Sequence, residues 1–247
     1  MKNEMNKKYE FTGETKRLDG RIVKRIRAIR DFSDVKTGEL GGWIEHESNL
    51  SHDGGAWVYD ESKIYGSAVV RDDAAIFDSA KVYGNAIVCD RAFVADFSNV
   101  FDNATVGGSA MIFGNSRIHE MARVIGEARI FDHVECEGCS LITGNANILG
   151  STTITGGAYI AHDAHVESNL DWFSVTICGR CPSLTFFRSV DFGIRAEDEF
   201  ITCPIESYEE EVRLKFGDSV LVSTYLAALE LARVYFKMED SYINMKG

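Results

Sequence analysis

Cysteines stand in two closely spaced pairs, Cys136-Glu-Gly-Cys139 and Cys178-Gly-Arg-Cys181, and Cys203 follows further along the chain. Pairs of thiolates separated by two residues are typical of a two-knuckle zinc site, in which four such ligands surround the ion. This spacing makes Cys178, Cys181 and Cys203 candidate metal ligands. Free thiols with no metal are the alternative that we favour.

Other residues that can do chemistry lie between residues 60 and 165. Four histidines are candidate general bases, because imidazole exchanges a proton near neutral pH: His119, His133, His162 and His165. Three aspartates, each eighteen residues after the one before, are candidate cation ligands: Asp60, Asp78 and Asp96. Whether these side chains meet depends on the elements that carry them.

Those elements come from a six-residue repeat that runs from Ala56 to Asn169 without an insertion. Among its nineteen hexads the first position is Ala or Ser in seventeen, the third is Val or Ile in eighteen, and the fifth is Gly or Asp in sixteen. The first and third positions point to the same side of a strand, which must be the interior. Gly and Asp at the fifth position permit a bend.

Each hexad is therefore a short strand followed by a corner, and three hexads close one triangular coil of eighteen residues. Nineteen hexads give about six coils, stacked at the roughly 4.8 Å spacing of parallel strands. The predicted fold class is mainly β: a single-stranded parallel β-helix of hexapeptide repeats. Its left-handedness follows from resemblance to that class and not from a physical rule.

The position of a residue within its hexad predicts whether its side chain points inward, outward or to a corner, and this applies to the candidate ligands and bases. Cys136 takes an inward Val/Ile position and Cys139 a corner, so the two diverge and Cys136 is interpreted as a core residue. His119 points outward beneath Phe101, which makes it the best candidate base, with a stacked surface side chain as the more common alternative. The aspartate column is interpreted first as a set of corner-forming residues with solvated carboxylates.

One side of the prism carries an apolar band on its outer surface, at the outward positions of successive coils. Its members are Trp57, Tyr59, Phe77, Phe93, Met111, Phe113 and Phe131. Contiguous exposed apolar patches usually mark an interface. The band therefore predicts an oligomer interface, most simply of a parallel homotrimer. A stabilising aromatic ladder, or docking of one of the terminal segments, is the alternative.

The chain divides into three predicted parts: a cap with an irregular first coil at 1–55, the hexapeptide β-helix at 56–169, and a small α+β domain at 170–247. In the cap, the runs Tyr9–Thr12 and Ile22–Ile29 read as strands, the second at an edge. In the last part, short strands precede two helices. Ser207-Tyr-Glu-Glu210 reads as a capping box that opens the first helix, and the second reaches about Lys237.

Charge is distributed unevenly over a chain with formal net charge −12. Residues 1–40 hold 11 Lys and Arg against 7 Asp and Glu, whereas residues 41–169 hold 7 against 18. An acidic coil repels nucleic acid, so we expect none as a partner. Arg25 and Arg27, together with Gly179 and Arg180, are candidate ligands for a small anion. Internal charge pairing of the two N-terminal arginines is the alternative.

Composition predicts a cytoplasmic protein. No run of 18 apolar residues occurs, and the first residues lack the apolar stretch of a signal peptide, so we expect no membrane as a partner. Six cysteines in 247 residues are typical of reduced thiols rather than of a disulfide framework.

The segment Asp31-Phe-Ser-Asp-Val35-Lys-Thr-Gly38-Glu-Leu-Gly-Gly-Trp43 is not part of the repeat consensus. With Asn49-Leu-Ser and Trp57-Val-Tyr-Asp60, it resembles the YdcK-like β-helix proteins of enterobacteria and related phage-encoded proteins, over residues 9–169. The tail resembles that of the phage relatives. Members are usually labelled transferases by analogy with hexapeptide acyltransferases, an analogy of fold that assigns no site.

Resemblance to an acyltransferase of that superfamily would imply a histidine at a subunit interface, commonly with a loop extruded from the coil. It would also imply basic residues near the last coils that bind the phosphates of coenzyme A. Here the coil has no loop and its histidines occupy three different columns. We therefore expect a non-enzymatic, oligomeric binding or scaffold protein of phage or prophage origin, without a cofactor. The alternatives are an acyltransferase and a protein that sequesters an anionic small molecule such as a nucleotide signal.

Overall fold

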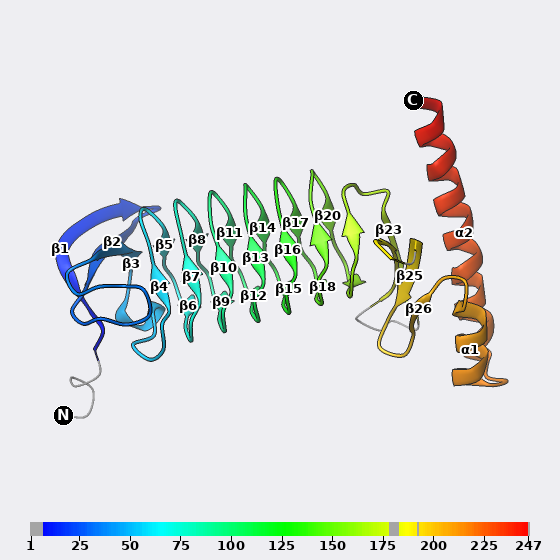
Figure 1. Cartoon of the computed structure of the whole chain (residues 1–247), viewed down its shortest axis with the longest axis horizontal. Coiled ribbons are helices and arrows are strands. Elements are labelled where there is room, and N and C mark those ends of the chain that lie inside the picture. The colour runs from blue at the N-terminus through cyan, green and yellow to red at the C-terminus, as the bar shows by residue number, and fades with distance from the viewer. Residues whose placement is uncertain (1–6, 178–182, 192, 247) are drawn as a thin grey trace.

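The structure is a computed structural model that describes residues 7–177, 183–191 and 193–246 (Figure 1). It confirms the predicted parallel β-helix. Three columns hold seven, seven and six parallel strands, which is about seven turns. The extra turn comes from residues before Ala56, because β3 (Leu40–Ile44) already pairs in parallel with β5 (Lys63–Ile64).

Every strand of the β-helix is only two residues long after β3. The first column continues through β5, β8 (Lys81–Val82), β11 (Asn99–Val100), β14 (Arg117–Ile118), β17 (Glu135–Cys136) and β20 (Thr153–Ile154). The second holds β4 (Trp57–Val58), β7 (Ala75–Ile76), β10 (Phe93–Val94), β13 (Met111–Ile112), β16 (Arg129–Ile130), β19 (Asn147–Ile148) and β22 (His165–Val166). The third holds β6 (Val69–Val70), β9 (Ile87–Val88), β12 (Thr105–Val106), β15 (Arg123–Val124), β18 (Leu141–Ile142) and β21 (Tyr159–Ile160).

The interior is filled by the first and third residues of each hexad, as predicted. Ile64, Val94 and Ile130 are 0% exposed. Complete burial of such a side chain contributes about 1.5–3 kcal/mol, so the repeated core dominates the stability of the prism. Cys136 occupies the same inward position and is fully buried, which confirms its interpretation as a core residue.

Corners are built from residues in the left-handed backbone conformation, with φ of 49° at Asp60 and 71° at Gly66. A corner aspartate also joins two turns. The Asp90 carboxylate accepts a hydrogen bond from the backbone N–H of Gly108, eighteen residues later, at 2.8 Å. Glycine is needed where corners stack most closely, since a Cβ on Gly108 would lie 2.6 Å from the Gly126 carbonyl oxygen. The carboxylates are therefore structural acceptors and not simply solvated groups.

The N-terminal end is closed by a hairpin of β1 (Tyr9–Leu18) and β2 (Arg21–Ala28), which continues the first column in the order β1-β2-β3. Its turn has positive φ at Asp19 and Gly20, as a two-residue hairpin turn requires. The prediction that residues 22–29 form an edge strand is wrong, because β2 pairs with β3 as well as β1. A short 3₁₀ helix, η1 (Glu47–Asn49), follows in the first coil.

The C-terminal end is closed by an antiparallel sheet. Its strands, in sheet order, are β23 (Trp172–Val175), β24 (Leu184–Ser189), β25 (Gly193–Glu197) and β26 (Thr202–Pro204). Strand β24 meets the last turn, where the Tyr159 N–H donates to Thr185 Oγ1 at 2.8 Å and Ala164 bridges to Ser189. Phe187, on the same strand, is fully buried in the β-helix core.

Two helices cover the outer side of this sheet, α1 (Tyr208–Phe216) and α2 (Val220–Lys246) (Figure 1). Gly217 ends α1, but the predicted capping box does not form. Ser207 has helical backbone angles and its hydroxyl donates to the Pro204 carbonyl, so it is not available to cap the helix. Helix α2 extends beyond the predicted end near Lys237.

Candidate functional site

The outward side chains of the second column form a ladder that we call the Phe93 face. Its rings follow one another from Tyr59 to Phe131, with centroid separations of 4.0 to 5.4 Å. The ladder consists of Tyr59, Phe77, Phe93, Phe113 and Phe131, beside Met111. The stacking that we gave as one alternative for this band is therefore present, and each ring shields its neighbours from water.

Trp57 is an exception, and the expectation that it lies on the outer surface is wrong. The cap buries it completely. The rings of Tyr9 and Phe32 meet the Trp57 ring edge-on, with centroid separations of 6.1 Å and 5.3 Å. The next member of the band is also engaged, since the Tyr59 hydroxyl donates to Asp34 at 2.9 Å. The loop before β3 therefore docks on the first turn of this face, and no other segment of the described residues covers the band from Phe77 onward.

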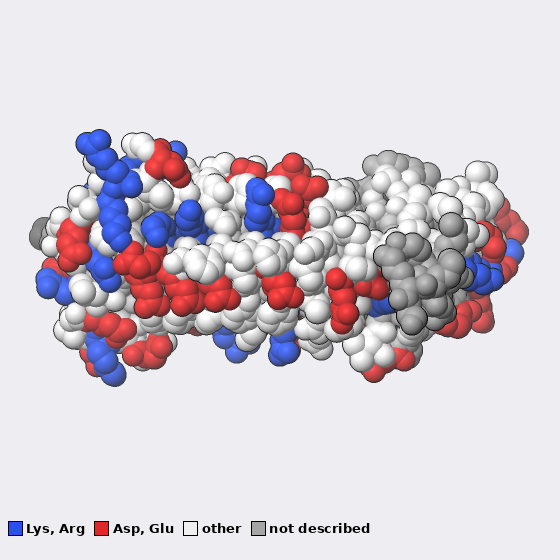
Figure 2. Space-filling view, turned by 90° about the horizontal axis from the view of Figure 1, so that it is seen from above, with Lys and Arg blue, Asp and Glu red and all other residues white. Residues whose placement is uncertain are grey.

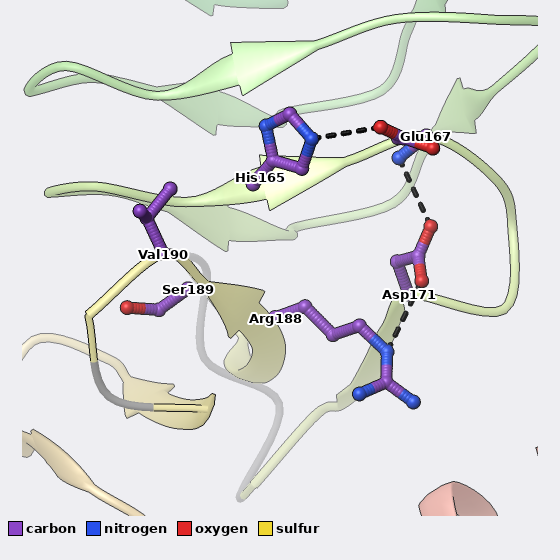
Figure 3. Close-up of a pocket in the computed structure, with 6 residues that line it drawn as sticks. All are labelled: His165, Glu167, Asp171, Arg188, Ser189 and Val190. Atoms are coloured by element: carbon purple, nitrogen blue, oxygen red, sulfur yellow. Dashed lines mark hydrogen bonds and ion pairs between the residues drawn. The ribbon is translucent and has the colours of Figure 1, made fainter. Parts of the chain in front are cut away.

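At its far end the Phe93 face leads into a pocket of about 520 Å³ (Figure 3). The pocket lies between the last turn of the β-helix and the C-terminal sheet. It is lined by His165, Glu167, Asp171, Arg188, Ser189 and Val190. His165 and Glu167 point outward from the last turn, and the other four residues come from the segment that closes this end.

Polar contacts hold the pocket residues in place. His165 Nε2 lies 2.8 Å from Glu167 Oε1, and Arg188 Nε lies 3.2 Å from Asp171 Oδ1. The second oxygen of Asp171 accepts from the backbone N–H groups of Glu167 and Ser168. An imidazole oriented by a carboxylate, with a guanidinium in the same pocket, is an arrangement that can accept a proton next to a bound anionic group.

A buried polar cluster lies at the same joint. Glu197 is 3% exposed, and burial raises its pKa to about 7. His162 Nε2 approaches its Oε2 at 3.1 Å, and Thr202 donates to its other oxygen at 2.9 Å. Burial, with a smaller effect from nearby Arg195, lowers the pKa of His162. The contact between the prism and the C-terminal sheet therefore contains groups whose charge can change near neutral pH.

The first column carries a second ladder, which we call the His119 face. Tyr65, Tyr83, Phe101 and His119 stack nearly in parallel at 4.7 to 4.9 Å. One turn further, Glu135 and Glu137 flank the inward Cys136 and approach His119. The predicted position of His119 beneath Phe101 is therefore correct, but its Nε2 faces two carboxylates rather than open solvent.

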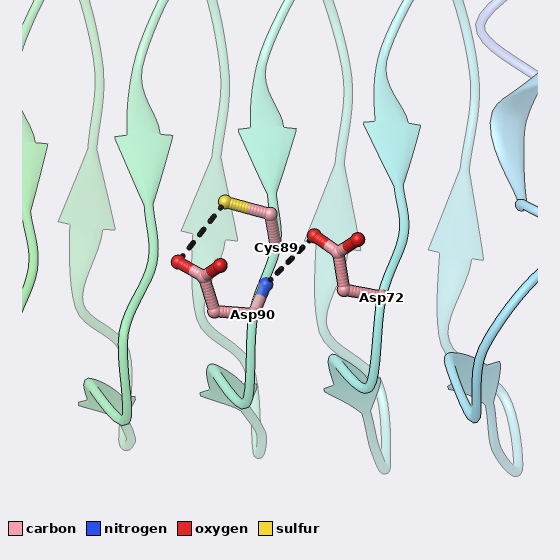
Figure 4. A group of neighbouring side chains, drawn as sticks. All are labelled: Asp72, Cys89 and Asp90. Carbon is pink, nitrogen blue, oxygen red and sulfur yellow. Dashed lines mark hydrogen bonds between the residues drawn. The ribbon is translucent and has the colours of Figure 1, made fainter.

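A third group of possible ligands lies at the corners, where Asp72, Cys89 and Asp90 come together (Figure 4). Here the oxygens already have structural partners. Asp72 accepts from the Asp90 backbone N–H at 3.2 Å, and the Asp90 oxygen nearest Cys89 accepts from Gly108. The Cys89 thiol is buried, and burial raises its pKa. The aspartates at 60, 78 and 96 form a similar ladder.

The predicted anion ligands lie far apart in the sequence, and only the N-terminal pair is described. Arg25 pairs with Glu61 at 3.4 Å and lies over the Trp43 ring, and Arg27 pairs with Glu10 at 2.5 Å. Internal charge pairing, the alternative interpretation, is therefore observed for both. Cys178, Gly179, Arg180 and Cys181 lie outside the described residues. Cys203 is described and buried, and burial raises its pKa to about 11.

Two clusters were not predicted, although part of each has a signal in the sequence. Glu135 and Glu137 are two residues apart around an inward position, and His119 precedes Glu137 by one turn of eighteen residues. His165 and Glu167 show the same two-residue spacing. No periodicity places Arg188 or Asp171 beside them, because both follow the end of the repeat.

Comparison with known proteins finds a local similarity. No family model matches the chain. A protein of Escherichia coli (strain K12) named "Uncharacterized acetyltransferase YdcK" is 38% identical over 69 residues, which is 28% of this chain and 20% of that protein. The match thus spans about a fifth of the relative's length. In the described residues, no helix has both the length and the apolar character needed to span a membrane. The similarity and the β-helix together fit a YdcK-like hexapeptide-repeat protein.

Proposed function

We propose that this protein is a non-catalytic binding scaffold whose copies associate through the Phe93 face, most simply as a trimer with that face turned toward a common axis. The observation that carries the proposal is the apolar strip that runs from Phe77 through Phe113 to Phe131, which no other segment of the described residues covers. Met111, in the middle of the strip, is 37% exposed. Contiguous apolar surface of this kind is typical of an interface.

The chain itself supports the use of this face for docking. The cap lies over the first turn of the strip, where Phe32 contacts Trp57 and Asp34 accepts from Tyr59. The following turns present the same kind of surface with no covering segment among the described residues. A second copy offers a strip of the same length, straightness and rigidity, because both are built on the same prism.

The acidic charge of the β-helix limits the kind of partner that can bind to the Phe93 face. Residues 41–169 carry 18 acidic against 7 basic residues, and Figure 2 shows a row of acidic side chains along the β-helix beside a band of uncharged ones. Such a field repels nucleic acid and other polyanions. An apolar strip on an acidic prism is better matched by another apolar strip, with the charged residues of both copies left in solvent.

The oligomeric state tests this proposal. Light scattering at micromolar concentration should give about three times the chain mass of 27.5 kDa. Phe93→Asp combined with Phe113→Asp should reduce the mass to that of one chain. Phe97→Asp is the matched control, because Phe97 is 64% exposed but lies at a corner outside the strip. A monomeric wild type, or a double variant with unchanged mass, contradicts the proposal.

Acyl transfer is the second candidate, and the pocket at the end of the Phe93 face favours it. His165 and Glu167 form a 2.8 Å pair in a pocket that also contains Arg188, and the relative in Escherichia coli carries an acetyltransferase name. His165 and Glu167 belong to the last turn, and Arg188 comes from the strand that closes this end, close to the coils where a superfamily enzyme would carry basic residues. His119, the earlier candidate base, lies on a different face.

In this reaction the His165 imidazole would act as the general base. With Nε2 donating to Glu167, the Nδ1 lone pair of His165 accepts the proton of an acceptor amine or hydroxyl. The acceptor atom forms a bond to the acyl carbon of a thioester, the carbon–sulfur bond breaks, and the thiol leaves after protonation. Arg188 would hold an anionic group of the donor.

Activity measurements separate the two candidates. For a scaffold, we expect no binding of acetyl coenzyme A by calorimetry and no release of free thiol above background. Saturable binding with thioester cleavage, lost in His165→Ala and retained in His133→Ala, would establish acyl transfer. His133 is an appropriate control because it is exposed and lies outside the pocket.

A further inference from the structure

Three metal-ligating side chains converge on the His119 face, away from the pocket and from the Phe93 face. His119 Nε2 lies 3.0 Å from Glu135 Oε1 and 3.7 Å from Glu137 Oε2. One ligand atom from each residue lies within 4.8 Å of both others. The side chains are 11%, 32% and 32% exposed in that order, so the cluster has restricted access to water.

The fold holds these groups in position. Glu135 and Glu137 point outward from either side of Cys136, whose burial anchors their strand. The His119 ring lies one turn away and is stacked on Phe101 at 4.7 Å with an interplanar angle of 2°. Little side-chain freedom is lost when a ligand binds to groups that are already oriented in this way.

The present contacts leave the cluster incompletely satisfied. Glu135 is shared by His119 and Arg117, whose Nη1 lies 3.4 Å away. Among the described residues, the only polar contact of the Glu137 side chain is that of its Oε2 with His119 Nε2, at 3.7 Å. Two carboxylates therefore converge on a single imidazole nitrogen. The contrast with Asp72 and Asp90 is clear, since backbone N–H groups satisfy those carboxylates.

We propose that His119, Glu135 and Glu137 bind one divalent first-row transition-metal ion, for which Zn²⁺ is the best match. A tetrahedral zinc ion with bonds of about 2.1 Å separates its ligand atoms by about 3.4 Å, close to both recorded separations. Two carboxylates and a neutral imidazole balance the ion's charge, and water completes the coordination. The ion links the turn of β14 to the turn of β17.

Nitrogen and carboxylate donors favour zinc over the harder cations. Ca²⁺ takes six to eight oxygen ligands, and Mg²⁺ requires near-octahedral oxygen coordination, neither of which three side chains with one imidazole supply. Co²⁺ prefers the same donors as Zn²⁺ and has visible absorption bands that report its ligands. It is therefore the spectroscopic probe for this site.

The test uses full-length protein that has been treated with a chelator and dialysed. Calorimetry with ZnCl₂ should show one ion per chain, and CoCl₂ should produce visible bands without the cobalt–thiolate charge-transfer absorption that cysteine ligands would cause. His119→Ala should abolish binding. Glu137→Gln, which keeps the shape of the side chain, should weaken it at least tenfold, in line with loss of one anionic ligand.

Controls make the result specific. His133→Ala and Glu127→Gln alter exposed groups of the same types elsewhere on the prism and should bind zinc like the wild type. Thermal unfolding monitors whether each variant is folded, and zinc should raise the melting temperature of the wild type but not of His119→Ala. Binding that survives both His119→Ala and Glu137→Gln, cobalt spectra with thiolate bands alone, or no binding by the wild type overturns the proposal.

Discussion

The Phe93 face and the His119 face are built by the same repeat, and both begin as ladders of stacked aromatic rings near the cap. They differ at the other end. The Phe93 face ends in a pocket that needs Arg188 and Asp171 from the segment beyond the β-helix. The His119 face ends in a cluster made only by hexad residues, and its two glutamates lie one turn before the last strand of that column.

The difference shows how one repeat produces two kinds of site. Stacking at eighteen residues brings outward side chains into register, so a cluster can arise wherever polar residues replace rings in a column. A pocket, by contrast, needs a wall that the flat side of a prism does not have. The C-terminal sheet supplies that wall. The pocket at the end of the Phe93 face therefore depends on how the C-terminal end of the prism is closed, whereas the His119 cluster does not.

Removing the side chain that closes the end should have the largest effect. Phe187→Ala deletes a fully buried ring from the end of the prism and should lower the free energy of unfolding by about 3–5 kcal/mol. Urea unfolding measures the loss. Hydrogen exchange should show protection lost in β22 to β25 and retained in β11 to β17. Equal loss in both regions would contradict the independence of the His119 face. Phe97→Ala, at an exposed position, should cost under about 0.5 kcal/mol.

The same end should respond to pH. The pKa of Glu197 is about 7 in the folded protein, above its usual value of 4.5. The folded state therefore holds this proton more tightly than the unfolded state, and the associated stability is lost as pH rises from about 4.5 to 7. The loss should reach about 3 kcal/mol. Glu197→Gln should flatten this part of the stability–pH curve. An unchanged slope in that variant would show that another group is responsible.

Two arginines allow a direct comparison of the faces. Arg188 is 30% exposed, pairs with Asp171 and lies over Phe236, while Arg117 is 53% exposed, pairs with Glu135 and lies over Phe101. Arg188→Met should cost about 1–2 kcal/mol, because it leaves the more buried carboxylate, that of Asp171, without its cationic partner.

Arg117→Met should cost under about 0.5 kcal/mol, as is usual for exposed ion pairs. Thermal unfolding of both variants under the same conditions gives the comparison. Equal costs would mean that the C-terminal wall adds nothing to the environment of Arg188.

The smallest effect concerns the corners that both faces share. Asp90→Gly removes the acceptor for the Gly108 N–H but tolerates the positive φ of 58°. It should cost under about 1 kcal/mol, because the carboxylate is exposed. The hydrogen bond from Gly108 lowers the pKa of Asp90, so its contribution is present at neutral pH and is lost as acid protonates the folded group. Asp90→Ala should cost more than Asp90→Gly, because alanine is strained at positive φ.

Much of the molecule could be predicted from the repeat. Cys136 in the core, His119 beneath Phe101 and the ladder of Phe113 and Phe131 all follow from counting positions in six and eighteen. The prediction is wrong where another segment intervenes. Trp57 has an outward position in its hexad but is buried by the cap, and no local pattern indicates that Tyr9 and Phe32 fold over it.

The sequence by itself determined the prism, its interior and the columns on its sides, because each hexad repeats the same local geometry and neighbouring turns are a constant distance apart along the chain. Only the tertiary structure decided which positions on those columns become sites. Arg188 reaches His165, and Glu197 reaches His162, through contacts between the prism and the sheet that closes it. Such contacts depend on how two unlike surfaces fit, and they leave no period in the sequence.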